Sequence, residues 1–263
     1  MKKAVVLIGV GEMGGVFAKG FLRAQYPVYP IEQGADIHKA ADEIKDPLAV
    51  VIAVRENDLQ GVLKDIPKKW RDRLILLQNE LLPKDWQAYH IANPTVISVW
   101  FEKKPGLDAK EIIPSPVFGP RAGLVKDVLG TINLHSKIAA SEDEMLFELV
   151  VKNLYILTVN IAGLKVGGTV GELWGKHQEL ARKVSSDILD IQFRLIGREL
   201  DRQKLIDRMA EAFEGDLAHQ CMGRSAPERL KRTLAFADEF ELEVPSLRSI
   251  PLPLWEGLGE GKK

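Results

Sequence analysis

Short apolar runs and longer amphipathic stretches alternate along the first part of the chain. The apolar runs predict strands at residues 4–8, 27–31, 48–54, 74–77 and 95–101, and the continuous run at 48–54 fits burial on both faces of a sheet. Between them, the helical spacing of apolar residues predicts helices over residues 16–24, 38–44 and 58–65. Because strands alternate with helices, the pattern predicts a doubly wound parallel α/β sheet.

The pattern becomes mainly helical in the second part of the chain. Residues 130–134 and 155–159 still predict strands, with a helix over about residues 142–151 between them. After Gly168, one apolar stripe has helical spacing and comprises Val170, Trp174, His177, Ala181, Val184, Ile188, Ile191 and Leu195. Two more helices are predicted at residues 203–219 and 227–240, and residues 257–263 are expected to form a loose tail. We therefore expect an α/β domain over residues 1–163 and a smaller all-helical domain over residues 164–263.

A glycine-rich segment directly follows the first predicted strand and leads into the first predicted helix. It fits the pattern G-x-G-x-x-G and consists of Gly9, Val10, Gly11, Glu12, Met13 and Gly14. Gly9 permits a tight turn, Gly11 lets the backbone approach a pyrophosphate, and Gly14 lets the helix pack close to the strand. The free N–H groups of the helix N-terminus then face the anion. The segment predicts a dinucleotide phosphate site, and a glycine turn without such a role is the alternative.

Polar residues follow three of the later strands, at the sheet edge where open α/β sheets bind ligands. Glu32 lies 18 residues beyond Gly14, where a carboxylate accepts hydrogen bonds from the adenosine ribose and favours NAD over NADP. Arg55 is expected to reach a cofactor phosphate or a substrate carboxylate, and Asn79 a sugar or substrate oxygen. The alternatives are a turn carboxylate, a solvated charge and a loop-capping amide, respectively.

Composition and charge narrow the class of protein. The formal net charge of −1 gives no sign of a nucleic-acid partner or an acidic membrane surface, and no apolar run approaches the roughly 20 residues of a membrane helix. Cys221 is the single cysteine, which fits a reducing compartment. None of the five histidines pairs at zinc-ligand spacing, so no metal is expected. We expect a cytoplasmic protein that acts on a small molecule.

Four charged residues share one face of the helical part. Glu172 and Lys176, and likewise Glu179 and Lys183, are four residues apart with the acid first, which favours ion pairs along a helix. From this pattern alone, Lys176 belongs to a salt-bridged surface.

Several segments resemble two families of nicotinamide-dependent dehydrogenases. Residues 9–15 are similar to the start of ketopantoate reductases and of 3-hydroxyacid dehydrogenases. Residues 76–79 resemble the strand end whose Asn contacts cofactor or substrate in ketopantoate reductases, and residues 172–176 resemble the segment with their catalytic lysine. Residues 168–171 are similar to the approach to the lysine helix of 3-hydroxyacid dehydrogenases. The resemblance implies an N-terminal Rossmann domain and a C-terminal helical domain of the 6-phosphogluconate dehydrogenase type.

The resemblance also implies a catalytic role for Lys176. In those families the lysine gives a proton or a strong hydrogen bond to the carbonyl oxygen as hydride arrives, and the developing alkoxide needs such a donor. The sequence departs from ketopantoate reductases where they carry Asn four and eight residues after the lysine, because Leu180 and Val184 stand there. Their late carboxylate, which holds the substrate hydroxyl, falls near Ser225, and Glu228 replaces it only with a shift in alignment.

These features predict an NAD(P)-dependent oxidoreductase that transfers hydride between nicotinamide and a small oxo or hydroxy acid. The expected cofactor is NAD(P)(H), leaning towards NAD, since the basic residue that ketopantoate reductases use for NADP is missing near Gln33. Asn79 and Arg55 would orient cofactor and substrate, and the apolar stripe of the helical domain predicts a homodimer. Two alternatives stay open: a dinucleotide-binding protein without dehydrogenase activity, acting as a sensor or assembly partner, and a ketopantoate reductase proper.

Overall fold

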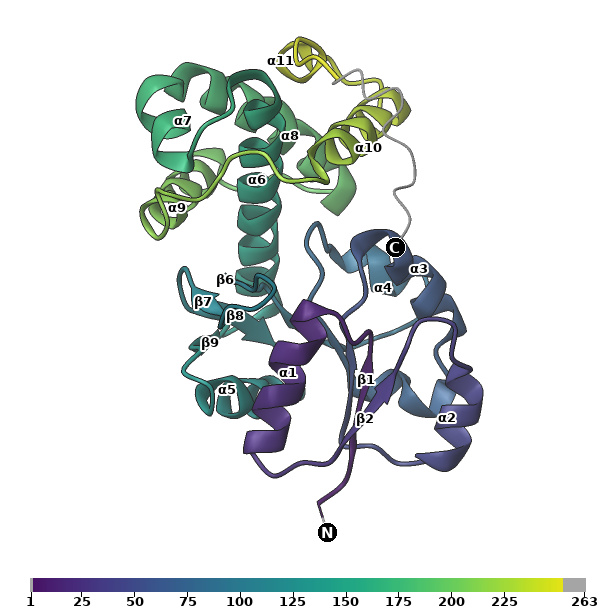
Figure 1. Ribbon diagram of the computed structural model, residues 1–263. Helices are drawn as coiled ribbons and strands as arrows, with labels where there is room; N and C mark the ends of the chain where they lie inside the picture. The colour runs from purple at the N-terminus through teal and green to yellow at the C-terminus, as the bar shows by residue number, and fades with distance from the viewer. Residues whose placement is uncertain (1, 253–263) are drawn as a thin grey trace, which may run out of the picture. The chain divides into compact units, whose positions relative to one another are not determined.

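The computed structural model describes residues 2–252, and these divide into two compact units between Asn153 and Leu154 (Figure 1). The division falls inside one long helix, α6 (Glu142–Val166), and residue 163 lies later in that helix. The predicted tail at residues 257–263 lies outside the described residues.

The first unit contains a seven-stranded sheet and a separate two-stranded one. Its strands are β1 (Val5–Ile8), β2 (Val28–Ile31), β3 (Ala49–Ile52), β4 (Leu74–Leu76), β5 (Thr95–Ile97), β6 (Phe101–Glu102), β7 (Lys110–Glu111), β8 (Ser115–Phe118) and β9 (Ser136–Ile138). Its helices before α6 are α1 (Glu12–Arg23), α2 (Ile37–Glu43), α3 (Glu56–Asp65), the 3-10 helix η1 (Lys68–Arg73), α4 (Pro83–Gln87) and α5 (Ala122–Gly130).

The large sheet has the strand order β2-β1-β3-β4-β5-β8-β9. All neighbouring strands are parallel except β5 and β8, which pair antiparallel. Val5 of β1 pairs with Val28 of β2 on one side and with Ala49 of β3 on the other. The chain therefore adds β2 on one side of β1 and then crosses to add β3 on the other, so the strand order reverses at β1. Ligands of such sheets bind beyond the carboxyl ends of the strands at this reversal. The predicted doubly wound α/β fold is confirmed.

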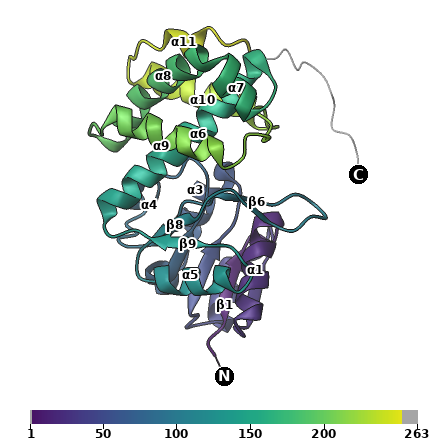
Figure 2. The same ribbon diagram turned by 90° about the vertical axis from the view of Figure 1, so that its left-hand side faces the viewer.

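Side chains of the central strands alternate between two apolar cores, because successive residues of a strand face opposite sides of the sheet. Val6 and Ile8 belong to one core, with Trp70 of η1 and residues of α2 and α3. Val5 and Leu7 belong to the other core, with residues of α1 and α5. These two helices lie side by side in both views (Figures 1 and 2).

The second unit is helical, as predicted. After α6 it contains α7 (Val170–Lys176), α8 (Gln178–Ile196), α9 (Arg202–Glu214), α10 (Ala226–Glu239) and α11 (Pro245–Arg248). The predicted apolar stripe is buried along α8, at Ala181, Val184, Ile188 and Ile191, whereas His177 is exposed. By length and composition alone α6 could cross a membrane, but 83% of its most apolar 18-residue window is buried inside the protein, as in a core helix.

Two predicted strands are helical in the structure. Residues 155–159 lie within α6, where Tyr155, Leu157 and Val159 are all buried. A short apolar run does not distinguish a strand from a helix that is apolar all round, so the prediction was wrong. Residues 130–134 were also wrong: Gly130 ends α5, and the chain then turns through Asn133, which has a positive φ of 60°.

Other boundaries also differ from the predictions. The predicted strand at residues 95–101 ends at Ile97, because the amide of Trp100 donates to the Ser115 hydroxyl (2.9 Å) and Phe101 pairs with Glu111 in the small sheet. The helix predicted at residues 203–219 ends at Glu214. Strands β8 and β9 and helices α4 and α5 were not predicted.

Candidate functional site

The glycine turn between β1 and α1 is fixed by close contacts of its backbone. Gly9 has a left-handed φ of 95°, and a β-carbon there would lie 2.7 Å from the carbonyl oxygen of Ala53. A β-carbon on Gly14 would collide with the carbonyl oxygen of Gly9. Both positions therefore require glycine for the fold itself, since a side chain on Gly9 would push the turn away from the end of β3 and one on Gly14 would push α1 away from the turn.

Gly11 differs from these two glycines because, apart from its two chain neighbours, no residue has an atom within 4 Å of the β-carbon it would carry. It is the N-cap residue of α1 in an extended conformation, and no side chain caps this helix end. The first amides of a helix are available to an anion unless a side chain caps them. The turn thus leaves open space at a helix N-terminus, which fits a diphosphate.

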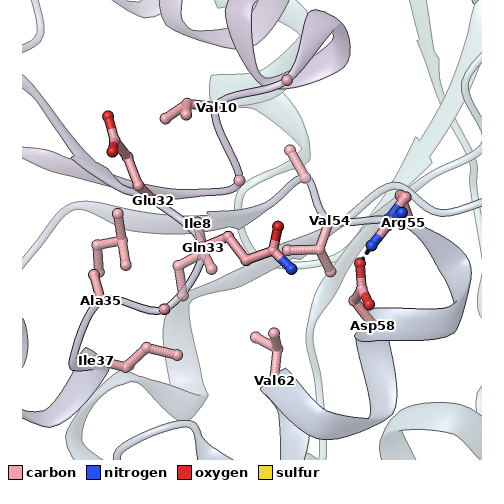
Figure 3. A pocket seen from close by; sticks show the side chains of 15 residues that line it. Ile8, Val10, Glu32, Gln33, Ala35, Ile37, Val54, Arg55, Asp58 and Val62 are labelled. Carbon is pink, nitrogen blue, oxygen red and sulfur yellow. Dashed lines mark hydrogen bonds and ion pairs between the residues drawn. The ribbon is translucent and has the colours of Figure 1, made fainter. Parts of the chain in front are cut away.

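A cavity of about 440 Å³ opens at the carboxyl ends of β1, β2 and β3 (Figure 3). Its lining residues are Ile8, Gly9, Val10, Gly11, Ile31, Glu32, Gln33, Gly34, Ala35, Ile37, Ala53, Val54, Arg55, Asp58 and Val62. Aliphatic side chains predominate, and Glu32 and Arg55 lie on opposite sides of the cavity (Figure 3). An apolar slot with a few polar groups and this volume is typical of a small-molecule or cofactor site. The residues fit an adenine ring, a ribose beside Glu32 and a diphosphate at Gly11.

The structure brings the glycine turn, Glu32 and Arg55 together at this cavity, but Asn79 is not among the lining residues. Arg55 precedes α3, and its Nε lies 2.8 Å from Oδ2 of Asp58 with 75% of its side chain exposed. Asn79 donates to Oε1 of Glu56 at 3.0 Å, in the first turn of the same helix. The two predicted residues therefore contact the same end of α3.

The sequence reasoning missed a buried amide at the end of β4. The side chain of Gln78 donates to the carbonyl of Ile52 (2.7 Å) and accepts from the amide of Leu77 (3.1 Å). Gln78 is only 7% exposed, and it ties the carboxyl ends of β3 and β4 together. Its position directly after an apolar run was the available signal.

Residues 33–35 and Asp58 also line the cavity without having been predicted. Gly34, with a positive φ of 84°, forms the turn that follows β2, so a glycine soon after the predicted ribose carboxylate was the signal there. For Asp58 the signal was its place three residues after Arg55, which is ion-pair spacing on a helix.

Lys176 lies in the last turn of α7 with 70% of its side chain exposed. Its Nζ lies 3.1 Å from Oε1 of Glu172, and Lys183 pairs with Glu179 at 2.7 Å, so both predicted ion pairs are confirmed. Glu172 also accepts from the amide of Thr169 (3.1 Å) in a capping box. The hydrogen bond from Lys176, followed by the one from Thr169, lowers the pKa of Glu172.

Ser225 and Glu228 lie at the start of α10. Ser225 is the N-cap residue, and its hydroxyl accepts from the buried Arg229 at 2.8 Å. Glu228 pairs with Lys231 (3.2 Å) and lines a cavity of about 510 Å³ within the second unit, to which Ser225 does not contribute. The structure therefore separates the two candidates: the Ser225 side chain makes no capping hydrogen bond and contacts Arg229, whereas Glu228 forms part of a cavity wall.

No protein-family model matches the chain, and no curated protein matches it by sequence. Solved structures share its fold. A dimeric ketopantoate reductase from Staphylococcus aureus has a TM-score of 0.61 at 15% identity, over 94% of this chain and 95% of that one. The 2-dehydropantoate 2-reductase from Methylococcus capsulatus has a TM-score of 0.68 at 11% identity, over 94% of each chain. D-mandelate dehydrogenase in complex with NADH has a TM-score of 0.67 at 14% identity, over 95% of this chain and 96% of that one.

At these identities the similarity establishes the fold alone. It covers nearly the whole chain, so it includes both the α/β unit and the helical unit. The chain has the fold of the ketopantoate reductases and of D-mandelate dehydrogenase, as the resemblance in its glycine turn and lysine segment implied.

Proposed function

We propose that this protein binds a nicotinamide dinucleotide beyond the carboxyl ends of β1, β2 and β3 and uses it as an oxidoreductase. The observation that carries this proposal is the glycine turn, which leaves a helix N-terminus open beside a largely aliphatic cavity of about 440 Å³. In this proposal the amides at the start of α1 hold the diphosphate, and Glu32 holds the adenosine ribose. The cofactor supplies the hydride, and the protein supplies binding and orientation.

NAD(H) is the preferred form in this proposal. The carboxylate of Glu32 would repel the 2′-phosphate of NADP, and Gln33 beside it is uncharged. Arg55 lies across the cavity and is paired with Asp58, so its positive charge is already partly balanced.

We assign the substrate to the small oxo or hydroxy acids. One solved neighbour, D-mandelate dehydrogenase, forms a ternary structure with NADH and anilino(oxo)acetate, which carries a carbonyl next to a carboxylate as a 2-oxo acid does. Lys176 is the proposed proton donor to the substrate oxygen. Lys176 forms an ion pair with Glu172 in the structure. To donate a proton, its ammonium must leave Glu172 and form a hydrogen bond with the substrate instead. A homodimer in the cytoplasm completes the proposal, since the Staphylococcus aureus neighbour is dimeric.

Calorimetric titration with NADH and with NADPH tests the binding step directly. Saturable heat with NADH at micromolar concentration is expected, and the absence of heat with both nucleotides would refute the proposal. Loss of NADH absorbance across a panel of 2-oxo acids then tests the chemistry.

A second candidate is a dinucleotide-binding protein without dehydrogenase activity. It is favoured by Leu180 and Val184, which stand where ketopantoate reductases carry Asn, and by the ion pair that engages Lys176. Tight NADH binding without turnover of any oxo or hydroxy acid in the panel would support it. Turnover of ketopantoate with NADPH would instead indicate a ketopantoate reductase proper.

A further inference from the structure

Glu12 places a carboxylate on the first residue of α1, directly after the glycine turn. Its side chain is about half exposed, and an acid in a first turn stabilises the helix through its dipole. The same helix end is the proposed diphosphate site, however, and two anions at one helix N-terminus repel each other. The charge of Glu12 therefore opposes dinucleotide binding unless a cation balances it.

Lys103 provides a cation at this position. Its Nζ lies 2.8 Å from Oε2 of Glu12 and donates to the carbonyl of Lys104, also at 2.8 Å. Only 20% of the Lys103 side chain is exposed, which is low for a lysine, and a charge so far removed from water needs a partner. The contact joins residues that are far apart in the sequence, so the fold brings this charge to the turn.

The segment that carries Lys103 has other contacts with α1. The ring of Phe101, in β6, packs against the ring of Phe17 with 6.4 Å between centroids. Lys19 pairs with Asp108 at 3.0 Å, further along the same helix. Because these contacts also hold the β6–β7 segment on α1, the charge of Lys103 is separable from the anchoring of its loop.

We propose that Lys103 is a positioning residue of the dinucleotide site, which neutralises Glu12 and thereby allows the N-terminus of α1 to receive a diphosphate. This inference rests on the proposed function. It assigns the pair of Glu12 and Lys103 an electrostatic role that a contact serving only the fold would not have.

A double-mutant cycle tests the inference, with NADH as the probe and calorimetry as the readout. K103A should weaken NADH binding by about tenfold at low salt. The loss should fall below about twofold in 1 M salt, where the Debye length is only about 3 Å. In the E12Q background, removing Lys103 should have no further effect, and E12Q alone should bind NADH at least as tightly as the unmodified protein.

K19A is the matched control, because it breaks the other ion pair between α1 and this loop and leaves Glu12 alone. It should bind NADH as the unmodified protein does. Equal weakening in K19A and K103A, an equal K103A effect with and without Glu12, or weaker binding in E12Q would each overturn the inference. K103Q replaces K103A if that variant does not fold. If the unmodified protein binds neither NADH nor NADPH, the proposed function itself fails, which is a distinguishable result.

Discussion

The carbonyl oxygen of Gly9 occupies the space that a β-carbon on Gly14 would need. The turn between β1 and α1 is therefore closed upon itself, with the start of the helix packed directly against the end of the strand. Gly9 and Gly14 are therefore required by the fold, whether or not a ligand binds. Gly11 has no such backbone contact, so its open space is available to a ligand.

Gly14→Ala should destabilise the first unit, because the added methyl group overlaps a backbone oxygen that cannot move without displacing β1. Overpacking of this kind costs about 1–3 kcal/mol, which chemical denaturation measures as a lower midpoint. Gly15→Ala is the control, since a β-carbon at Gly15 meets no atom within 4 Å. A Gly14→Ala protein as stable as the control would contradict the close approach of Gly9 and Gly14.

Gly11→Val should lose dinucleotide binding with a much smaller loss of stability. The valine side chain enters open space as far as the protein is concerned, but it occupies the room proposed for the diphosphate. Replacing a glycine N-cap costs about 1 kcal/mol at most, whereas NADH affinity should fall by more than about tenfold. Retained affinity in calorimetry would exclude this helix end as the phosphate site.

Glu32→Ala should change the choice of cofactor. Without the carboxylate, NADH loses its ribose hydrogen bonds and should bind about tenfold more weakly. NADPH is relieved of a repulsive charge and should bind as tightly as before or more so. The ratio of the two dissociation constants measures the effect, and an unchanged ratio would mean that Glu32 does not contact the ribose.

Lys176→Ala and Lys183→Ala form a matched pair for the catalytic proposal. Both lysines are exposed on the helical unit, and each makes an ion pair with the glutamate four residues before it. If Lys176 donates the proton, its loss should lower kcat by about 100-fold or more, whereas the Lys183 variant should keep its rate. Equal rates in the two variants would show that Lys176 is not the proton donor and is only part of a salt-bridged surface, as its charge pattern predicts.

Glu172 gives the second unit a dependence on acid. Its pKa is lowered in the folded protein, so its contribution to stability is fully present above about pH 4.3, its unfolded value, and is lost as the pH falls through the lower folded value. E172Q should therefore have a lower Tm than the unmodified protein at pH 7, and the difference should shrink at pH 2–3. E179Q should show a smaller effect, because Glu179 pairs with Lys183, whereas Glu172 accepts a hydrogen bond from the amide of Thr169 in addition to its ion pair. If the Tm difference between E172Q and the unmodified protein were the same at pH 2–3 as at pH 7, the charge of Glu172 would not be its cause.

Features that depend on residues close together in the sequence were predicted correctly. The turn after β1 and the ion pairs Glu172–Lys176 and Glu179–Lys183 depend on neighbours within a few residues, and each was predicted correctly. The strands β1 to β4 were predicted because an apolar run ended by polar or turn residues suffices to identify them.

The errors arose where the outcome depends on distant parts of the chain. Residues 155–159 belong to a helix that is buried on all sides, which an apolar run alone does not reveal. Lys103 lies on a segment whose pairing with β7 brings it to Glu12, and nothing in its own neighbourhood indicates that contact. At the end of β4 the buried side chain is Gln78, which the sequence did not single out, because sequence gives the end of a strand but not the direction of each side chain. The role of its neighbour Asn79 stays a prediction.

The bridge that Gln78 forms has a consequence for recognition. The side chain of Gln78 joins the last carbonyl of β3, that of Ile52, to the amide of Leu77 just after β4. The backbone segments that lead to Arg55 and Asn79 are therefore held in register by the protein's own hydrogen bonds. These segments lose their conformational entropy when the protein folds. A ligand that binds at this edge of the sheet therefore loses little binding free energy to ordering them.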